Sequence, residues 1–329
     1  MKVVDTFQFS EPFEADQLFI KLNLEDALVS EWLICENAYT TRGVHKGHFV
    51  SKVLEQPRFE PFLDRIKVFE VDHQGTVIGE HASGNQDGVT IANERHQRNA
   101  SRAYIREHYG EGDRILLSDA DECFDFTTEA ARQRFVAAAK TSGIYHARRR
   151  RFWFDIDNLW SEVRATPAIP YAMLAADPEL DFVDTRYQNC SPGEVREDVT
   201  SVFEYSAAFP LESIIAKYNS FIHTGYTEQE IRDALACNHL PVAASRGGAL
   251  SVDEKWWPER IDLEEFGAPQ WVRDNADRLS TGVIPDDYRE NRRARYPEYF
   301  SDDLLSRASV NQVGHKLAQG LRRIKRKLR

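Results

Sequence analysis

The chain has 329 residues, of which 42% are hydrophobic, so it can bury a full core as one large domain or two closely joined ones. The formal net charge of −11 argues against nucleic acid as a partner, because phosphate backbones are bound by clustered Lys and Arg. Four scattered cysteines, and no apolar run of about 18 residues that would span a bilayer, favour a cytoplasmic protein with free thiols.

Strands and helices alternate in the first half of the sequence. The apolar patterns predict strands at 3–9, 31–36, 66–71 and 114–119, and helices at 18–28, 90–109 and 127–140. Thr127 or Thr128 is the expected N-cap of the third helix. This order is typical of an α/β domain with a mainly parallel sheet that helices cover on both faces.

The second half predicts strands at 144–154, 168–174 and 201–209, and helices at 210–218 and 227–237. From residue 243 onward, we expect loops, turns and short helices. The last segment places apolar residues at helical spacing among many Lys and Arg: Leu317, Leu321, Ile324 and Leu328. This pattern predicts a basic amphipathic helix, which would lie on an anionic membrane surface or dock on the acidic body of the protein.

Two acidic pairs follow strand-like runs. The run from Arg114 ends at Asp119 and Asp121, and a second run ends at Asp155 and Asp157. Ligands of open α/β sheets bind at the carboxyl ends of the strands, and one or two carboxylates there bind Mg²⁺ or Mn²⁺ together with phosphate oxygens. The first pair therefore indicates a site for a nucleoside diphosphate, and the alternative for either pair is a solvated turn.

Several short motifs occur in a fixed order along residues 1–226. They are Val3-Val-Asp5-Thr-Phe7, Glu36-Asn-Ala-Tyr-Thr40 with Gly43 and Lys46, Gln97-Arg98-Asn99, Leu117-Ser-Asp119-Ala-Asp121-Glu122, and Lys217-Tyr-Asn-Ser-Phe-Ile-His223. This order resembles glycosyltransferase family 17, the family of β-1,4-mannosyl-glycoprotein β-1,4-N-acetylglucosaminyltransferases. Cys123-Phe124 and Gly225 depart from the family pattern, which has Ile-Pro at the first place and an acidic residue at the second.

The resemblance over residues 1–226 implies a fold and a reaction, and the pattern of the later residues completes the expected domain division. The fold is an α/β, GT-A-like single domain with a Rossmann-type nucleotide-sugar-binding half and a mixed central sheet, followed by a C-terminal helical extension. The expected divisions are 1–240 for the glycosyltransferase domain, 241–310 for an extension packed on it and 311–329 for the basic tail helix. The reaction is inverting transfer of N-acetylglucosamine from UDP-N-acetylglucosamine to a glycan hydroxyl, with Mn²⁺ or Mg²⁺. A cytoplasmic enzyme, peripheral at the inner membrane face through its tail, is the expected location.

The candidate site residues fall into three groups. The metal ligands are Asp119, Asp121 and His223. The donor-binding residues are Asp5, Glu36, Arg98, Asn99 and Asp119. The candidates for the base that accepts the acceptor proton, which the sequence does not rank, are Glu122, Glu197, Asp198 and Glu228.

Structural alternatives accompany these roles. Arg98 pairs with phosphate or orients Asp119, and its structural alternative is a buried salt bridge that holds the helix to the sheet. Glu36 is either a contact to the base or ribose of the donor or a strand-end surface charge. For the whole chain, the alternatives are a metal-dependent phosphoesterase or nucleotidyltransferase that uses the same pair, and a non-catalytic sugar-nucleotide or glycan binder, which Gly225 favours.

Overall fold

The computed structural model describes residues 1–78, 87–140, 143–187, 199–206, 208, 210–220, 227–238 and 258–295. The first half runs β1 (Val3–Gln8), η1 (Pro12–Glu14), α1 (Ala15–Glu25), β2 (Glu31–Asn37), α2 (Val50–Leu54), η2 (Pro57–Arg65), β3 (Ile66–Val71), α3 (Asp87–Arg98), α4 (Arg102–His108) and β4 (Arg114–Asp119). The middle runs β5 (Glu122–Phe124), α5 (Glu129–Ala139), β6 (Tyr145–Trp153), β7 (Asn158–Pro170), α6 (Tyr171–Ala176), α7 (Phe182–Tyr187) and β8 (Ser201–Ser206). The remainder is α8 (Leu211–Ser220), α9 (Glu228–Ala236), β9 (Glu259–Arg260), α10 (Gln270–Asp274), α11 (Ala276–Leu279) and α12 (Tyr288–Arg295).

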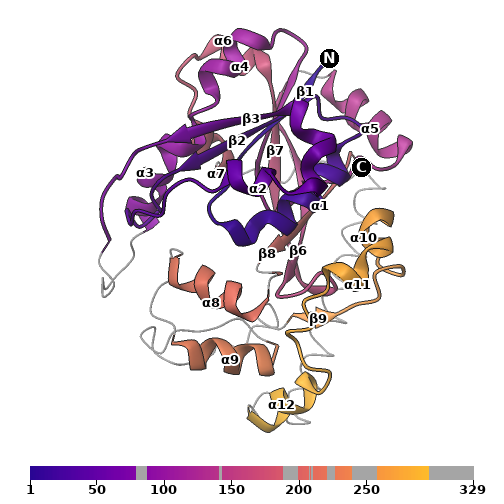
Figure 1. The fold of residues 1–329 in the computed structure, drawn as a ribbon. Coiled ribbons are helices and arrows are strands. Elements are labelled where there is room, and N and C mark those ends of the chain that lie inside the picture. The colour runs from indigo at the N-terminus through magenta and orange to yellow at the C-terminus, as the bar shows by residue number, and fades with distance from the viewer. Residues whose placement is uncertain are drawn as a thin grey trace, which may run out of the picture.

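One sheet runs through the protein in the order β3-β2-β1-β4-β7-β6-β8-β5, and β9 pairs with β7 (Figure 1). The strands β3, β2, β1 and β4 are parallel, which is the 3-2-1-4 order of a Rossmann-type half. Strand β7 is antiparallel to β4 and β6, β8 is parallel to β6, and β5 is antiparallel to β8. The expected α/β class with a mixed central sheet is confirmed. The expectation of a mainly parallel sheet is wrong, because the run of neighbouring parallel strands ends at β4.

Alternating side chains of the parallel strands build two separate cores. Phe7, Ile34 and Leu116 belong to the core that α1, α2 and η2 cover. Their neighbours Leu33 and Leu117 belong to the core on the opposite face, under α4, α6 and α7. Burial on both faces explains why these strands are nearly continuous apolar runs in the sequence.

Two of the predicted elements need correction. The helix predicted at 90–109 is two helices, α3 and α4, because Asn99 and Ser101 use their side chains in tertiary contacts: Asn99 accepts a hydrogen bond from the Phe182 amide at 2.9 Å, and Ser101 Oγ lies 2.6 Å from Thr6 Oγ1. The strand predicted at 168–174 ends at Pro170, whose ring cannot continue the ladder, and α6 begins there.

The described part of the C-terminal extension packs on the sheet. Strand β9 pairs with the start of β7, and Val272 of α10 is buried in a core with Phe152 and Tyr205. Within the described segments, the structure contains no apolar helix of the length that a lipid bilayer requires. The predicted tail helix at 311–329 lies outside the described residues.

Candidate functional site

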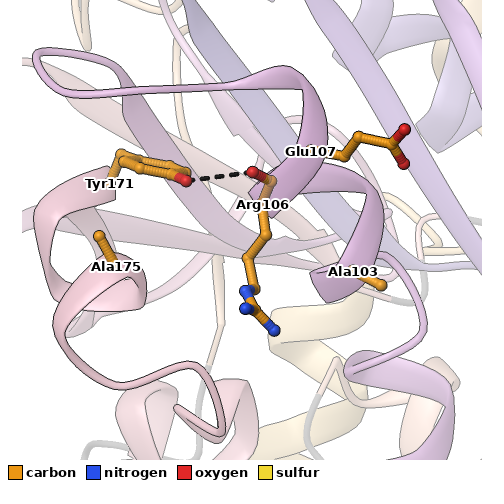
Figure 2. A pocket seen from close by; sticks show the side chains of 5 residues that line it. All are labelled: Ala103, Arg106, Glu107, Tyr171 and Ala175. Carbon is orange, nitrogen blue, oxygen red and sulfur yellow. Dashed lines mark hydrogen bonds between the residues drawn. The ribbon is translucent and has the colours of Figure 1, made fainter.

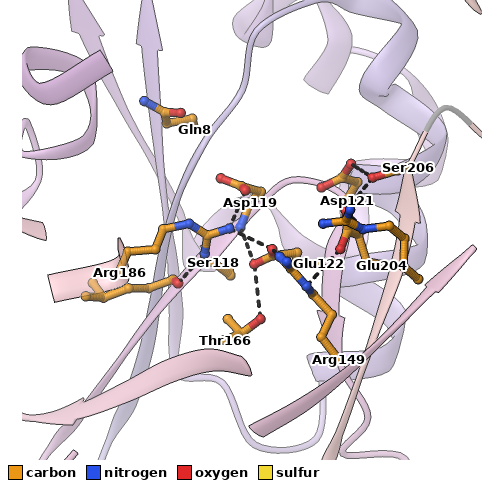
Figure 3. Close-up of polar contacts among 12 residues, drawn as sticks. Gln8, Ser118, Asp119, Asp121, Glu122, Arg149, Thr166, Arg186, Glu204 and Ser206 are labelled. Atoms are coloured by element: carbon orange, nitrogen blue, oxygen red, sulfur yellow. Dashed lines mark hydrogen bonds and ion pairs between the residues drawn. The ribbon is translucent and has the colours of Figure 1, made fainter. Parts of the chain in front are cut away.

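The first acidic pair stands where the parallel strand β4 ends. Strand β4 is buried up to Ser118, Asp119 is its last residue, and Glu122 opens the short strand β5. Asp121 lies in the turn between the two strands, where its backbone carbonyl accepts a 2.9 Å hydrogen bond from the Tyr205 amide of β8. The pair is therefore at the carboxyl edge of the Rossmann-type half, as the sequence pattern predicts (Figure 3).

Asp119 is held between two guanidinium groups. Its Oδ1 accepts a hydrogen bond from Arg98 Nη2 at 2.6 Å, and its Oδ2 pairs with Arg186 of α7. Burial by itself would raise the pKa of Asp119, but Arg186 and Arg98 outweigh it and lower the pKa below the usual value. Sequence analysis missed Arg186, because no motif surrounds it and only the fold brings α7 to this edge.

Arg98 forms the buried ion pairs of its structural alternative and also contacts Asp119. Its guanidinium is 3% exposed and donates to Glu94 at 2.7 Å, to the Ser118 carbonyl at 2.9 Å and to Gln8 at 3.1 Å, besides Asp119. These bonds join α3 to the ends of β1 and β4. Arg98 therefore orients Asp119.

Asp121 is the less paired carboxylate of the two. Its Oδ2 lies 3.1 Å from Ser206 Oγ and 3.7 Å from Lys217 Nζ, and its side chain is 17% exposed, against 33% for Asp119. In the described part of the chain, its Oδ1 has no hydrogen-bond or ion-pair partner. Burial raises the pKa of Asp121, Lys217 opposes the rise, and the nearby Glu204 adds to it.

Buried ion pairs fill the space behind Asp119 and Asp121. Glu122 pairs with Arg149 and Arg186, and its Oε2 accepts a 3.2 Å hydrogen bond from Thr166 (Figure 3). Glu204 lies 2.8 Å from Arg149 Nε. Glu122, one of the four base candidates, is therefore 1% exposed and engaged by two cations.

The arginines of β6 point to opposite faces of an interior strand. Arg149 and Arg151 each lie 2.8 Å from Glu204, whereas Arg150 stacks on Phe203 and Phe266. Burial raises the pKa of Glu204, but the two arginines outweigh this effect and the pKa falls below its usual value.

Asp5 lies beneath the edge. It is fully buried, accepts from Ser118 Oγ at 2.7 and 2.9 Å, and pairs with Lys21 Nζ at 2.5 Å. Lys21 also donates to Glu25 at 2.9 Å and to the Glu122 carbonyl at 2.7 Å. Asp5 thus supports the strand ends, and the structure does not bring it to the exposed rim with Asp121.

Glu36 and Asn99 fix neighbouring segments. The two oxygens of Glu36 accept hydrogen bonds from the backbone amides of Phe49 at 2.7 Å and Val50 at 3.0 Å, so this buried carboxylate begins α2. Asn99 bonds to the Phe182 amide and, at 3.3 Å, to Asp181. Both side chains are committed to the fold at these positions.

The remaining candidates lie elsewhere. Glu228 is exposed on the first turn of α9 and pairs with Arg232 at 2.6 Å. His223, Glu197 and Asp198 lie outside the described residues.

The rival acidic pair is structural. Asp155 is 1% exposed and accepts hydrogen bonds from Ser280 Oγ, Thr281 Oγ1 and the Gly282 amide at 3.1–3.2 Å. Asp157 pairs with Arg260 of β9 at 2.8 Å. The second pair thus anchors the extension to the β6–β7 hairpin.

The side chains that could ligate a metal ion at this edge fit only one kind of metal site. Among the described residues, no three His, Cys, Asp or Glu side chains come together around a common point. Both oxygens of Asp119 pair with arginines, which leaves Asp121 as the available carboxylate. Mg²⁺ is commonly bound by one or two carboxylates and completes its shell with waters and substrate phosphates. Asp121 fits such a site, and the described residues do not form a cage made of protein ligands.

A separate pocket lies at the opposite edge of the sheet. It has a volume of about 440 Å³ and is lined by Ala103, Arg106, Glu107, Tyr171 and Ala175 (Figure 2). The Tyr171 hydroxyl donates to the Arg106 carbonyl at 3.1 Å, and the Tyr171 amide donates to Asp113, just before β4 begins. The length of β4 therefore separates this pocket from Asp119.

The fold and the edge define a mixed α/β protein with a Rossmann-type half and an acidic pair at the carboxyl ends of its parallel strands. Comparison with protein-family models gives no match, and comparison with curated proteins gives none either. Among solved structures, the chain is similar to a mannose-1-phosphate geranyltransferase from Thermus thermophilus, with 12% sequence identity over 66% of this chain and 80% of that chain. The TM-score of 0.28 is too low for the function of that protein to bear on this one.

Proposed function

We propose that this chain is a transferase that moves a sugar from a nucleoside diphosphate donor to a hydroxyl group of a glycan. Asp121 is the observation that carries the proposal. It is a partly exposed carboxylate at the carboxyl edge of the Rossmann-type half, with Oδ1 unpartnered among the described residues and Lys217 3.7 Å from Oδ2. A diphosphate suits this place, because a lysine and a carboxylate-bound cation both attract phosphate oxygens.

The finer assignment comes from the sequence resemblance. It favours N-acetylglucosamine as the sugar, UDP-N-acetylglucosamine as the donor and inversion at the anomeric carbon. Inversion requires one base, which accepts the acceptor proton while the acceptor oxygen attacks.

The residues at the edge have different roles in the proposed reaction. Asp121 would hold Mn²⁺ or Mg²⁺, whose chemistry here is to neutralise the charge of the departing diphosphate. Arg98 and Arg186 keep Asp119 ionised and fixed in place. A carboxylate has about four lone-pair sites, so Asp119 can still accept a hydrogen bond from a ribose hydroxyl.

A non-catalytic sugar-nucleotide binder is the second candidate. It is favoured by the pairing of both Asp119 oxygens with arginines and by Gly225, which stands where the resembling family has an acidic residue. A metal-dependent phosphoesterase or nucleotidyltransferase would use the same edge.

One assay separates the three. The protein is incubated with a panel of nucleoside diphosphate sugars and Mn²⁺, and the released nucleotides are measured by chromatography. Release of a nucleoside diphosphate supports the transferase, and release of a nucleoside monophosphate supports the phosphoesterase. Tight donor binding without turnover supports the binder, and neither binding nor release of any nucleotide refutes the proposal.

A further inference from the structure

Glu14 is a carboxylate near the acidic edge that the sequence motifs do not indicate. It ends η1, the turn that follows β1, and so lies on the carboxyl side of the parallel strands. Phe13 packs in one cluster with Leu211 and Ile215 of α8, the helix that carries Lys217. Gln17, one helical turn after Glu14, donates to the Ala208 carbonyl at 2.8 Å just before α8. These contacts bring η1 beside the helix that faces Asp121.

The Glu14 carboxylate is fixed through one oxygen only. Oε2 accepts hydrogen bonds from the backbone amides of Ser10 at 2.7 Å and Glu11 at 3.4 Å. In the described segments, Oε1 has no hydrogen-bond or ion-pair partner. An anchored carboxylate with one available oxygen can accept a proton from a hydroxyl group that binds within hydrogen-bond reach of it.

The charges around Glu14 suit the same task. Burial raises the pKa of Glu14 to about 7, with Lys217 and the Ser10 and Glu11 amides opposing the rise and Asp121 adding to it. A base works best when its pKa lies near the operating pH. The other carboxylates of the edge differ: arginines hold Asp119 and Glu204 in the ionised form, and Glu122 is enclosed by two cations.

We infer that Glu14 is the catalytic base of the transferase, an assignment that rests on the proposed function. The acceptor hydroxyl gives its proton to Glu14 Oε1 while the acceptor oxygen forms a bond to the anomeric carbon. The bond between that carbon and the diphosphate oxygen breaks, and its electron pair leaves with the nucleoside diphosphate. The proton then passes from Glu14 to solvent, so the step needs no other reactant.

The test compares Glu14→Gln with the wild type, using the nucleoside diphosphate sugar that gives the fastest release and Mn²⁺. Gln keeps the shape and an acceptor for the Ser10 amide but cannot take the proton. We expect turnover to fall about 10²- to 10⁴-fold, as for other general bases, with an unchanged donor Kd. The wild-type rate should rise with pH as Glu14 loses its proton, at a lower pH than in the metal-free protein because Mn²⁺ at Asp121 lowers the pKa of Glu14, and the rate of the variant should not.

Glu11→Gln is the matched control, because Glu11 belongs to the same turn and loses the same charge. It should keep the wild-type rate and pH profile. A wild type that releases no nucleoside diphosphate overturns the transferase and this assignment together. An active wild type whose Glu14→Gln variant stays within about threefold of its rate overturns the assignment alone. Should the variant fail to fold, a wild-type rate that is flat from about pH 4 to 8 overturns it as well.

Discussion

Replacing Lys21 with Met is expected to destabilise the protein strongly. Lys21 is fully buried beneath the acidic edge, 2.5 Å from Asp5 and 2.9 Å from Glu25, both of which are also fully buried. The Met side chain fills a similar volume but leaves two buried carboxylates without their cation. Breaking a buried ion pair on one side costs about 3–5 kcal/mol, a large share of the roughly 5–15 kcal/mol that stabilises a typical domain.

The loss should depend on pH. Burial already raises the pKa of Glu25 to about 8, and Lys21 is the main group that opposes the rise. Without Lys21, the pKa of Glu25 rises further, so the folded state binds more protons than the unfolded state. Stability of the variant therefore falls as the pH rises above the unfolded-state pKa of about 4.3, and the gap from the wild type should be larger at pH 8 than at pH 5.

Urea unfolding at both pH values, followed by circular dichroism, measures this effect. The melting temperature should fall by about 6–20 °C, since each kcal/mol shifts it by about 2–4 °C in a large domain. Lys52→Met, at an exposed lysine of α2, is the control and should stay within about 0.5 kcal/mol. A Lys21→Met loss below about 1 kcal/mol at pH 8 would refute the reasoning, because the triad would then contribute no more than a surface pair.

Three further predictions concern the edge, the rival pair and the tail. Asp121→Asn should abolish nucleotide release and its dependence on Mn²⁺ while shifting the melting temperature by only about 2–4 °C; full activity would remove Asp121 from the site. Asp155→Asn should lower the free energy of unfolding by about 1–3 kcal/mol, because the amide cannot accept the same hydrogen bonds, and leave turnover unchanged; lost turnover at unchanged stability would contradict its anchoring role. From the sequence pattern, deleting 317–329 should abolish sedimentation with phosphatidylserine vesicles but not turnover, and unaltered sedimentation would dismiss the membrane role.

Strand and helix order could be predicted well in the Rossmann-type half. The predicted strand at 66–71 is β3, and Thr128 caps α5 by accepting a hydrogen bond from the Ala131 amide. These elements are set by local pattern, because the interior strands β1, β2 and β4 are buried on both faces and each helix has one apolar side.

The second half was less predictable. The strands predicted at 144–154 and 201–209 are β6 and β8, but the sequence did not indicate that β7 begins at Asn158 or that β6 pairs with both β7 and β8. Arg149 and Arg151 carry charges, yet they lie on an interior strand beside a buried carboxylate. A polar residue on a strand can be buried when an opposite charge from another segment meets it, and that partner is not visible locally.

The sequence by itself determined where the first acidic pair lies, since an apolar run that stops at Asp119 must end at the edge of the sheet. It did not determine which carboxylate is available for a ligand. Arg98 and Arg186 reach Asp119 from α3 and α7, while Asp121 keeps one oxygen unpartnered among the described residues. Charge pairing depends on distances between segments far apart in the chain, so only the tertiary structure shows that Asp119 and Asp121 differ in their ion pairs. For the same reason, only the tertiary structure brings η1, with Glu14, beside the helix that carries Lys217.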